Sequence, residues 1–94
     1  VLGRLISGCG NLTYANLSGW DVSSLYQIDV YPFSGCVNLV TLDLSGWNLD
    51  NTIVDRRLFE DCNNLKTVRM VGCSQTTIDK IKKVLPSGAS IETK

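Results

Sequence analysis

A segment of 14 residues that recurs in three copies constrains the fold of this chain more than any other feature. The copies at 8–21, 35–48 and 61–74 read GCGNLTYANLSGWD, GCVNLVTLDLSGWN and DCNNLKTVRMVGCS. The first two copies agree at 8 of 14 positions, and the last two agree at 5 of 14. Successive copies are offset by 27 and then 26 residues, so equivalent side chains form columns if the copies stack. The same offset holds upstream for a column of large apolar residues, Ile6, Phe33 and Phe59.

An offset of 26 to 27 residues lies within the range of leucine-rich repeats and below that of most helical repeats. The second copy follows the pattern L-x-x-L-x-L most fully, with Leu39, Leu42 and Leu44. Around Leu42, apolar and polar residues alternate as they do in a half-buried strand. The offset leaves room for a return segment and none for a hairpin. We therefore expect parallel strands near residues 14–18, 41–45 and 67–71.

The segments between these strands must return the chain to the start of the next strand. In 22–34 and in 49–59, apolar residues recur about every three residues, which is typical of a helix. Pro32 removes a backbone donor late in the first segment, which shortens any helix there. We therefore expect helical or 3-10 return limbs.

The pattern changes after Cys73. Thr76 and Thr77 precede an amphipathic series that predicts an N-capped helix, and residues 86–88 should end it. Residues 89–93 then predict a last strand near 90–93 at the sheet edge. The whole chain reads as one α/β leucine-rich repeat solenoid with a short parallel sheet on its concave side. Its expected parts are repeats at about 1–21, 22–48 and 49–74 and a helix-strand C-terminal cap at 75–94.

The phrase SGCxNLxxLDLSGWx and the tail NLKTVRMVGCSQTTIDKIKKVLPSGASI resemble the BspA-like leucine-rich repeat proteins of bacteria. The resemblance runs from about Ile6 to Ile91, and departs from the family pattern at Ala15 and Cys73. It implies a bacterial cell-surface or secreted protein that takes part in adhesion or host interaction. Because Val1 to Ile6 read as the middle of a return limb, we also expect further repeats before Val1.

Several other classes of function are disfavoured by composition. The formal net charge is zero and the only basic cluster, Lys80, Lys82 and Lys83, reads as a solvated helix face, so we expect no nucleic-acid partner. No apolar run approaches the roughly 20 residues of a membrane span, so none is expected. The chain contains no histidine and no C-x-x-C pair, so we expect no metal, no cofactor and no enzymatic activity.

Three columns of conspicuous residues are interpreted as structural. The cysteine column should face the core as reduced thiols, since parallel side chains oppose disulfide geometry. The tryptophans should fill the core while each indole N–H donates one hydrogen bond, although a ligand-stacking role is the alternative. The asparagines should bond to turn backbone. These columns are Cys9, Cys36 and Cys62, then Trp20 and Trp47, then Asn11, Asn38 and Asn64.

The side chains that alternate with the inward Leu-type positions define the candidate binding face. Their partner would be a protein or another host-surface macromolecule, and Asp43 should pair with Arg69 across neighbouring strands. The alternative is that these turns only space and cap a longer stalk. The oligomeric state stays open. The candidate concave face consists of Tyr14, Asn16, Ser18, Thr41, Asp43, Ser45, Thr67, Arg69 and Val71.

Overall fold

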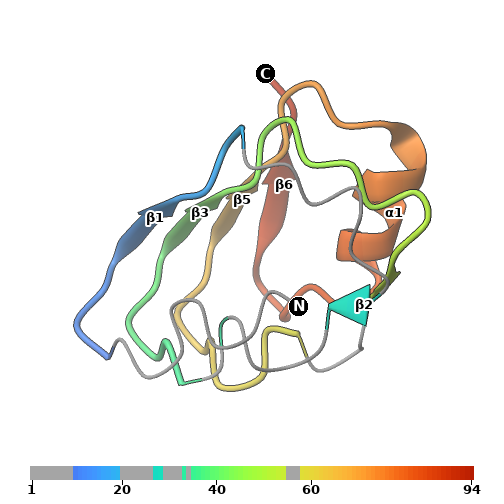
Figure 1. Cartoon of the computed structure of the whole chain (residues 1–94). Coiled ribbons are helices and arrows are strands. Elements are labelled where there is room, and N and C mark those ends of the chain that lie inside the picture. Colours follow the sequence, from blue (N-terminus) through green and yellow to red (C-terminus); the bar gives the residue numbers. More distant parts are fainter. Residues whose placement is uncertain (1–9, 20–26, 29–32, 34, 55–57) are drawn as a thin grey trace.

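The computed structural model describes residues 10–19, 27–28, 33, 35–54 and 58–94. Within these residues the chain forms a small α/β domain with a four-stranded parallel sheet, a two-stranded parallel sheet and one helix. The four-stranded sheet lies on one side of the molecule, and the second sheet and the helix lie on the other (Figure 1). The hydrophobic core fills the space between them.

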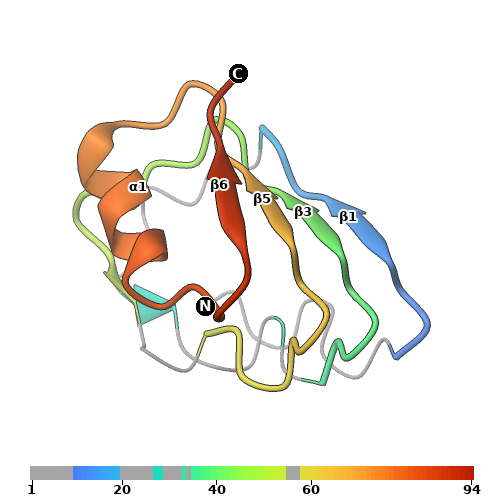
Figure 2. The ribbon, with the colours of Figure 1, turned by 180° about the vertical axis from the view of Figure 1, so that it is seen from behind.

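The strands of the main sheet follow one another in chain order, as the repeat offset predicted (Figure 2). Every neighbouring pair is parallel, so the expected parallel architecture is confirmed. Each strand is shorter than expected, because the regular ladder covers only the first three residues of each predicted segment. The strands are β1 (Tyr14–Asn16), β3 (Thr41–Asp43), β5 (Thr67–Arg69) and β6 (Ser90–Glu92).

The register of the main sheet aligns the repeat copies residue by residue. Ala15 is opposite Leu42, Leu42 is opposite Val68, and Val68 is opposite Ile91. Leu42 and Val68 are completely buried, and Ile91 at the end of the row is only partly buried. Because side chains alternate along a strand, the residues flanking this row face away from the core.

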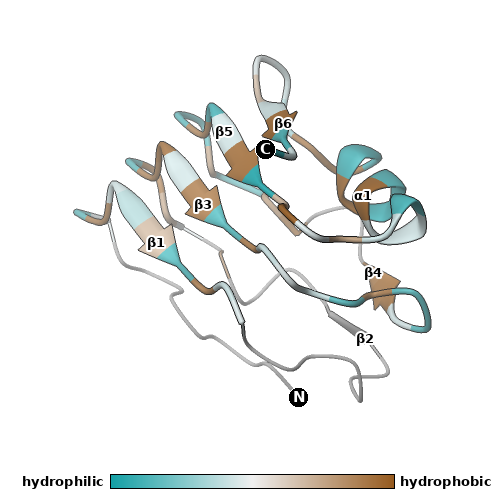
Figure 3. Cartoon of the chain, turned by 90° about the horizontal axis from the view of Figure 1, so that it is seen from above, coloured by the Kyte–Doolittle hydropathy of each residue, from teal (hydrophilic) through white to brown (hydrophobic). Residues whose placement is uncertain are grey.

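The return limbs differ from the expected helices. Each contains a two-residue strand, β2 (Gln27–Ile28) or β4 (Ile53–Val54), and these two strands pair in parallel (Figure 3). The helix expected over 49–59 is therefore wrong for its described part. The β-branched run from Thr52 to Val54 favours extended backbone over helix, which explains the difference. Phe33 is in a 3-10 conformation, while Pro32 lies outside the described residues.

The predicted cap helix is present as α1 (Gln75–Lys82). Its N-cap is Ser74, whose Oγ accepts a hydrogen bond of 3.1 Å from the Thr77 backbone N–H. The prediction that Thr76 and Thr77 precede the helix is wrong by a few residues, because Ser74 caps the first turn and both threonines lie within the helix. The apolar side of α1 faces the core, where Ile81 is fully buried (Figure 3).

Stacked columns build the interior of the domain. The rings of Phe33 and Phe59 stack with centroids 5.7 Å apart. Cys36 and Cys62 carry buried thiols, as predicted, and Cys62 Sγ donates to the Phe33 carbonyl at 3.3 Å. Burial raises the pKa of the Cys62 thiol to about 12. Ile6 and Cys9, the first members of the two columns, lie outside the described residues.

We expect the thiols to be reduced and largely protected in the native protein. The thiolate is the reactive form, and burial raises the pKa values of both Cys62 and the partly exposed Cys73. Titration with a thiol reagent should give slow, partial reaction before unfolding and all four equivalents after unfolding without reductant. Fewer than four equivalents in the unfolded chain would reveal a disulfide and contradict the prediction.

Candidate functional site

One face of the main sheet carries six of the nine residues predicted to form a binding surface, and the other three, Ser18, Ser45 and Val71, follow two residues after the ends of β1, β3 and β5. We call it the outer strand face, and it also includes Ser90 and Glu92 of β6. The register places its side chains in rows that cross the strands. The first row is Tyr14, Thr41, Thr67 and Ser90. The middle row is Asn16, Asp43, Arg69 and Glu92. The third row, just beyond the strands, is Ser18, Ser45 and Val71.

The last three residues of the middle row, Asp43, Arg69 and Glu92, form a connected line of charges. Arg69 pairs with Asp43 at 3.4 Å, which confirms the predicted ion pair. The same guanidinium makes a shorter contact of 2.7 Å with Glu92, a residue that the sequence interpretation missed. The last predicted strand was centred on Ile91. Since side chains alternate along a strand, the residues next to Ile91 face outward, so alternation could have identified Glu92. Arg69 therefore lies between two carboxylates.

The Asp43 carboxylate is more enclosed than a typical surface residue, with a relative exposure of 5%. Burial alone would raise its pKa, but hydrogen bonds from Ser45 and the charge of Arg69 outweigh that effect and lower it. Asp43 Oδ1 accepts from the Ser45 backbone N–H at 3.0 Å, and Asn16 Oδ1 accepts from the Ser18 N–H at the same distance. Asn16 and Asp43 thus shape the turns after their strands as well as facing outward.

Several side chains of the outer strand face keep much of their surface accessible. Tyr14 is 50% exposed and Val71 is 36% exposed. Arg69 keeps 37% of its side chain exposed despite its two partners. Between them, the first row offers the partly buried residues Thr41 and Thr67. This face therefore combines an aromatic ring, a cation and an aliphatic side chain over a floor of small polar residues.

The tryptophan and asparagine columns serve the interior of the domain. Trp47 is buried, and its Nε1 donates to the Leu17 carbonyl of the preceding copy at 2.7 Å, so its predicted core role is confirmed. Cys73, which replaces tryptophan in the third copy, donates to the equivalent carbonyl of Leu44 at 3.6 Å. This substitution keeps the bond between copies but fills less volume. Trp20 lies outside the described residues.

Asparagine side chains also link successive copies. Asn38 Nδ2 donates to the Gly10 carbonyl at 2.6 Å, and Asn64 Nδ2 donates to the Val37 carbonyl at 2.9 Å. The predicted bonds to turn backbone are confirmed for these two residues. Both acceptors occupy the same position of the copy before, so the interaction repeats with the sequence.

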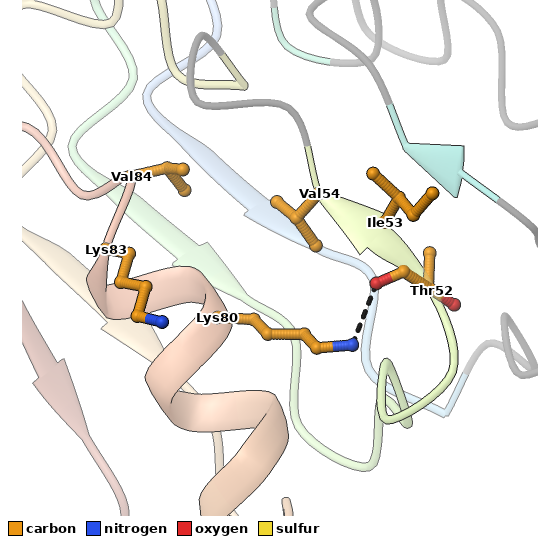
Figure 4. Close-up of a pocket in the computed structure, with 6 residues that line it drawn as sticks. All are labelled: Thr52, Ile53, Val54, Lys80, Lys83 and Val84. Carbon is orange, nitrogen blue, oxygen red and sulfur yellow. Dashed lines mark hydrogen bonds between the residues drawn. The ribbon is translucent and has the colours of Figure 1, made fainter.

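A second concave region lies between α1 and β4, where Thr52, Ile53, Val54, Lys80, Lys83 and Val84 line a groove of about 420 Å³ (Figure 4). The prediction of a merely solvated basic helix face is wrong for Lys80. Its Nζ donates to three backbone carbonyls, those of Leu49 at 2.7 Å, Asp50 at 2.9 Å and Thr52 at 2.9 Å. Lys80 therefore fixes the return limb to the helix.

Asp50 completes this junction. Its Oδ1 accepts from Ser74 Oγ at 2.5 Å and from Thr77 Oγ1 at 2.8 Å. Hydrogen bonds from Ser74 and Thr77, together with the charge of Lys80, lower the pKa of the Asp50 carboxyl. These contacts hold the cap in place.

Comparison of the chain with protein-family models, curated proteins and solved structures gave no significant match. Within the described part of the chain, no three acidic, cysteine or histidine residues cluster as they would around a metal ion. The helix found there is also too short and too polar to cross a bilayer. The outer strand face, where Tyr14 and Arg69 are accessible, is the candidate site that the geometry of the described residues favours.

Proposed function

We propose that this chain is a non-enzymatic interaction module of the BspA-like leucine-rich repeat type, which binds a protein or host-surface macromolecule through its outer strand face. It would belong to a bacterial surface or secreted protein. The observation that carries the proposal is the parallel register of the sheet, in which the exposed Tyr14 and the partly exposed Arg69 alternate with the buried inward row. Tyrosine and arginine are among the residue types enriched in binding hot spots.

The solenoid assignment draws support from contacts that repeat with the sequence. Each parallel strand is hydrogen-bonded to the strand of the next copy. The bond from Trp47 to the preceding copy has its counterpart at Cys73, and the asparagine bonds recur in the same way. Such nearest-neighbour contacts are the type of interaction that stabilises repeat proteins.

A second candidate function, that of a spacer and cap in a longer stalk, is favoured by the pairing of Arg69. Both carboxylates beside it already neutralise its charge. An ion pair of this exposure contributes at most about 1 kcal/mol and can be purely structural. The two candidate functions differ in what they predict for Tyr14, which takes no part in these ion pairs.

We expect replacement of Tyr14 by alanine to weaken adhesion at least tenfold, equivalent to about 1.4 kcal/mol. The measurement is attachment of beads carrying the protein to cultured epithelial cells, over a range of bead-bound protein densities. Ile53→Ala is the matched control, because Ile53 is 51% exposed and Tyr14 is 50% exposed, yet Ile53 lies on the second sheet. If Tyr14→Ala adhered as well as Ile53→Ala and the parent protein, the result would favour the spacer function.

A further inference from the structure

The backbone of β6 offers hydrogen-bonding groups at the open edge of the main sheet. The Ser90 N–H donates to the Lys66 carbonyl at 2.9 Å, and the Glu92 carbonyl accepts from the Met70 N–H at 2.8 Å. Both residues therefore direct their backbone groups toward β5. Because these groups alternate in direction along a strand, the N–H and C=O of Ile91 point to the opposite side. No described residue bonds to them.

An apolar groove of about 470 Å³ adjoins this edge on the core side of the sheet, between β6 and α1. The inward row of the sheet stops here. Leu42 and Val68 are completely buried, whereas Ile91 is only partly covered. A strand added about 4.8 Å beyond β6 would continue the row and place one side chain in this groove. The groove is lined by Gln75, Ile78, Lys82, Leu85, Ala89, Ser90, Ile91 and Thr93.

The charges around the β6 edge indicate which residue types an added strand should carry on each of its two faces. On the outer strand face, the middle row alternates from Asp43 to Arg69 to Glu92, and it ends on a carboxylate that is 51% exposed. A cation in the next position would continue the alternation. On the core side, Lys82 lines the groove and repels a second cation there. The complementary strand therefore carries basic residues outward and uncharged apolar residues inward.

We propose that the β6 edge is a second binding site, which accepts an extended segment of a partner protein by strand addition. The segment forms main-chain hydrogen bonds with Ile91, inserts an aliphatic side chain beside Ile78 and Leu85, and sets a lysine or arginine opposite Glu92. Recognition of this kind takes its affinity from the backbone and its specificity from alternate side chains. The site is separate from the Tyr14 end of the outer strand face, because β1 and β6 are the opposite edges of the sheet.

The test uses a capped, fluorescein-labelled heptapeptide of sequence TVKVKVT, titrated with the full chain and followed by fluorescence anisotropy. We expect saturable binding. A TVDVDVT peptide should bind at least tenfold more weakly, because it sets carboxylates opposite Glu92. The Tyr14→Ala variant should bind TVKVKVT as the parent does, which distinguishes this site from the proposed adhesion surface.

Two N-methylated peptides separate strand addition from non-specific adsorption. One carries methyl groups on the valine amides and the other on the lysine amides. Only one of these sets faces β6 in an added strand. Methylation of that set should abolish binding, and methylation of the other should leave it within about twofold. Equal effects of the two methylation patterns would overturn the proposal, as would failure of TVKVKVT to bind.

Protein variants locate the peptide. Glu92→Lys should weaken TVKVKVT binding at least tenfold, whereas Glu60→Lys, an equal charge change on an exposed turn, should not. Thermal melting shows that each variant is folded. Equal binding by the two variants would overturn the proposal. So would concentration-dependent dimerisation that Glu92→Lys abolishes, since the edge would then belong to a second copy of the chain.

Discussion

Replacing Leu42 with alanine is expected to lower the free energy of unfolding by about 3 kcal/mol. Leu42 lies in the centre of the main sheet, is fully buried, and is flanked by Ala15 and Val68 in the inward row. Its truncation removes apolar contacts and leaves a cavity that the paired strands on both sides cannot close. Urea denaturation followed by far-UV circular dichroism gives the change.

The control for Leu42 is Leu85→Ala, the same substitution at a partly buried position of the cap. Leu85→Ala should lower the free energy of unfolding by less than about half as much as Leu42→Ala, because truncation at a partly exposed position leaves a smaller cavity. If the two variants lost equal stability, the inward row would not be the main source of stability, and the sheet register would have to be reconsidered.

Thr77→Val is expected to have the second largest effect, a loss of about 2 kcal/mol. The Thr77 side chain is fully buried, and its Oγ1 accepts from the Leu49 N–H at 2.9 Å while donating to Asp50. Valine keeps the shape of threonine but leaves the buried Leu49 N–H without this acceptor. The two hydrogen bonds that Thr77 makes to the preceding return limb are then lost. Urea denaturation measures this change as well.

Thr77→Ser provides the comparison that isolates the hydroxyl group. Serine keeps both hydrogen bonds and loses one methyl group, so it should cost about 1 kcal/mol. Valine should therefore destabilise the protein more than serine does. The reverse order would show that packing of the methyl group, and not the polar junction, fixes the helix to the return limb.

The main sheet could be predicted because its signal is carried by whole columns. The cysteine, asparagine and leucine positions share one offset, and a one-residue slip would turn Leu42 from the core to the outer face. The same alternation predicted nine residues of the outer strand face, six of which lie within the strands. Columns also predicted the interior bond of Trp47 and the backbone bonds of Asn38 and Asn64.

The features that the sequence analysis missed depend on contacts between segments that no repeat pattern in the sequence connects. A spacing of about three residues suggested helical return limbs, but Ile53 and Val54, at the end of a β-branched run, pair with β2 instead. The anchoring role of Lys80 depends on three carbonyls about 30 residues earlier in the chain. A charge on a helix face gives no indication of such acceptors, so the junction could be found only from the structure.

The most direct test of the proposed contact surface is hydroxyl-radical footprinting of the protein, free and bound to epithelial cells, read by mass spectrometry. Modification of Tyr14 and Val71 should fall at least threefold on binding, because both side chains are exposed in the free protein. Modification of Val37 and Ile53, which are exposed elsewhere, should stay unchanged. If modification of Val37 and Ile53 fell on binding while modification of Tyr14 stayed unchanged, the assignment of binding to the outer strand face would be contradicted.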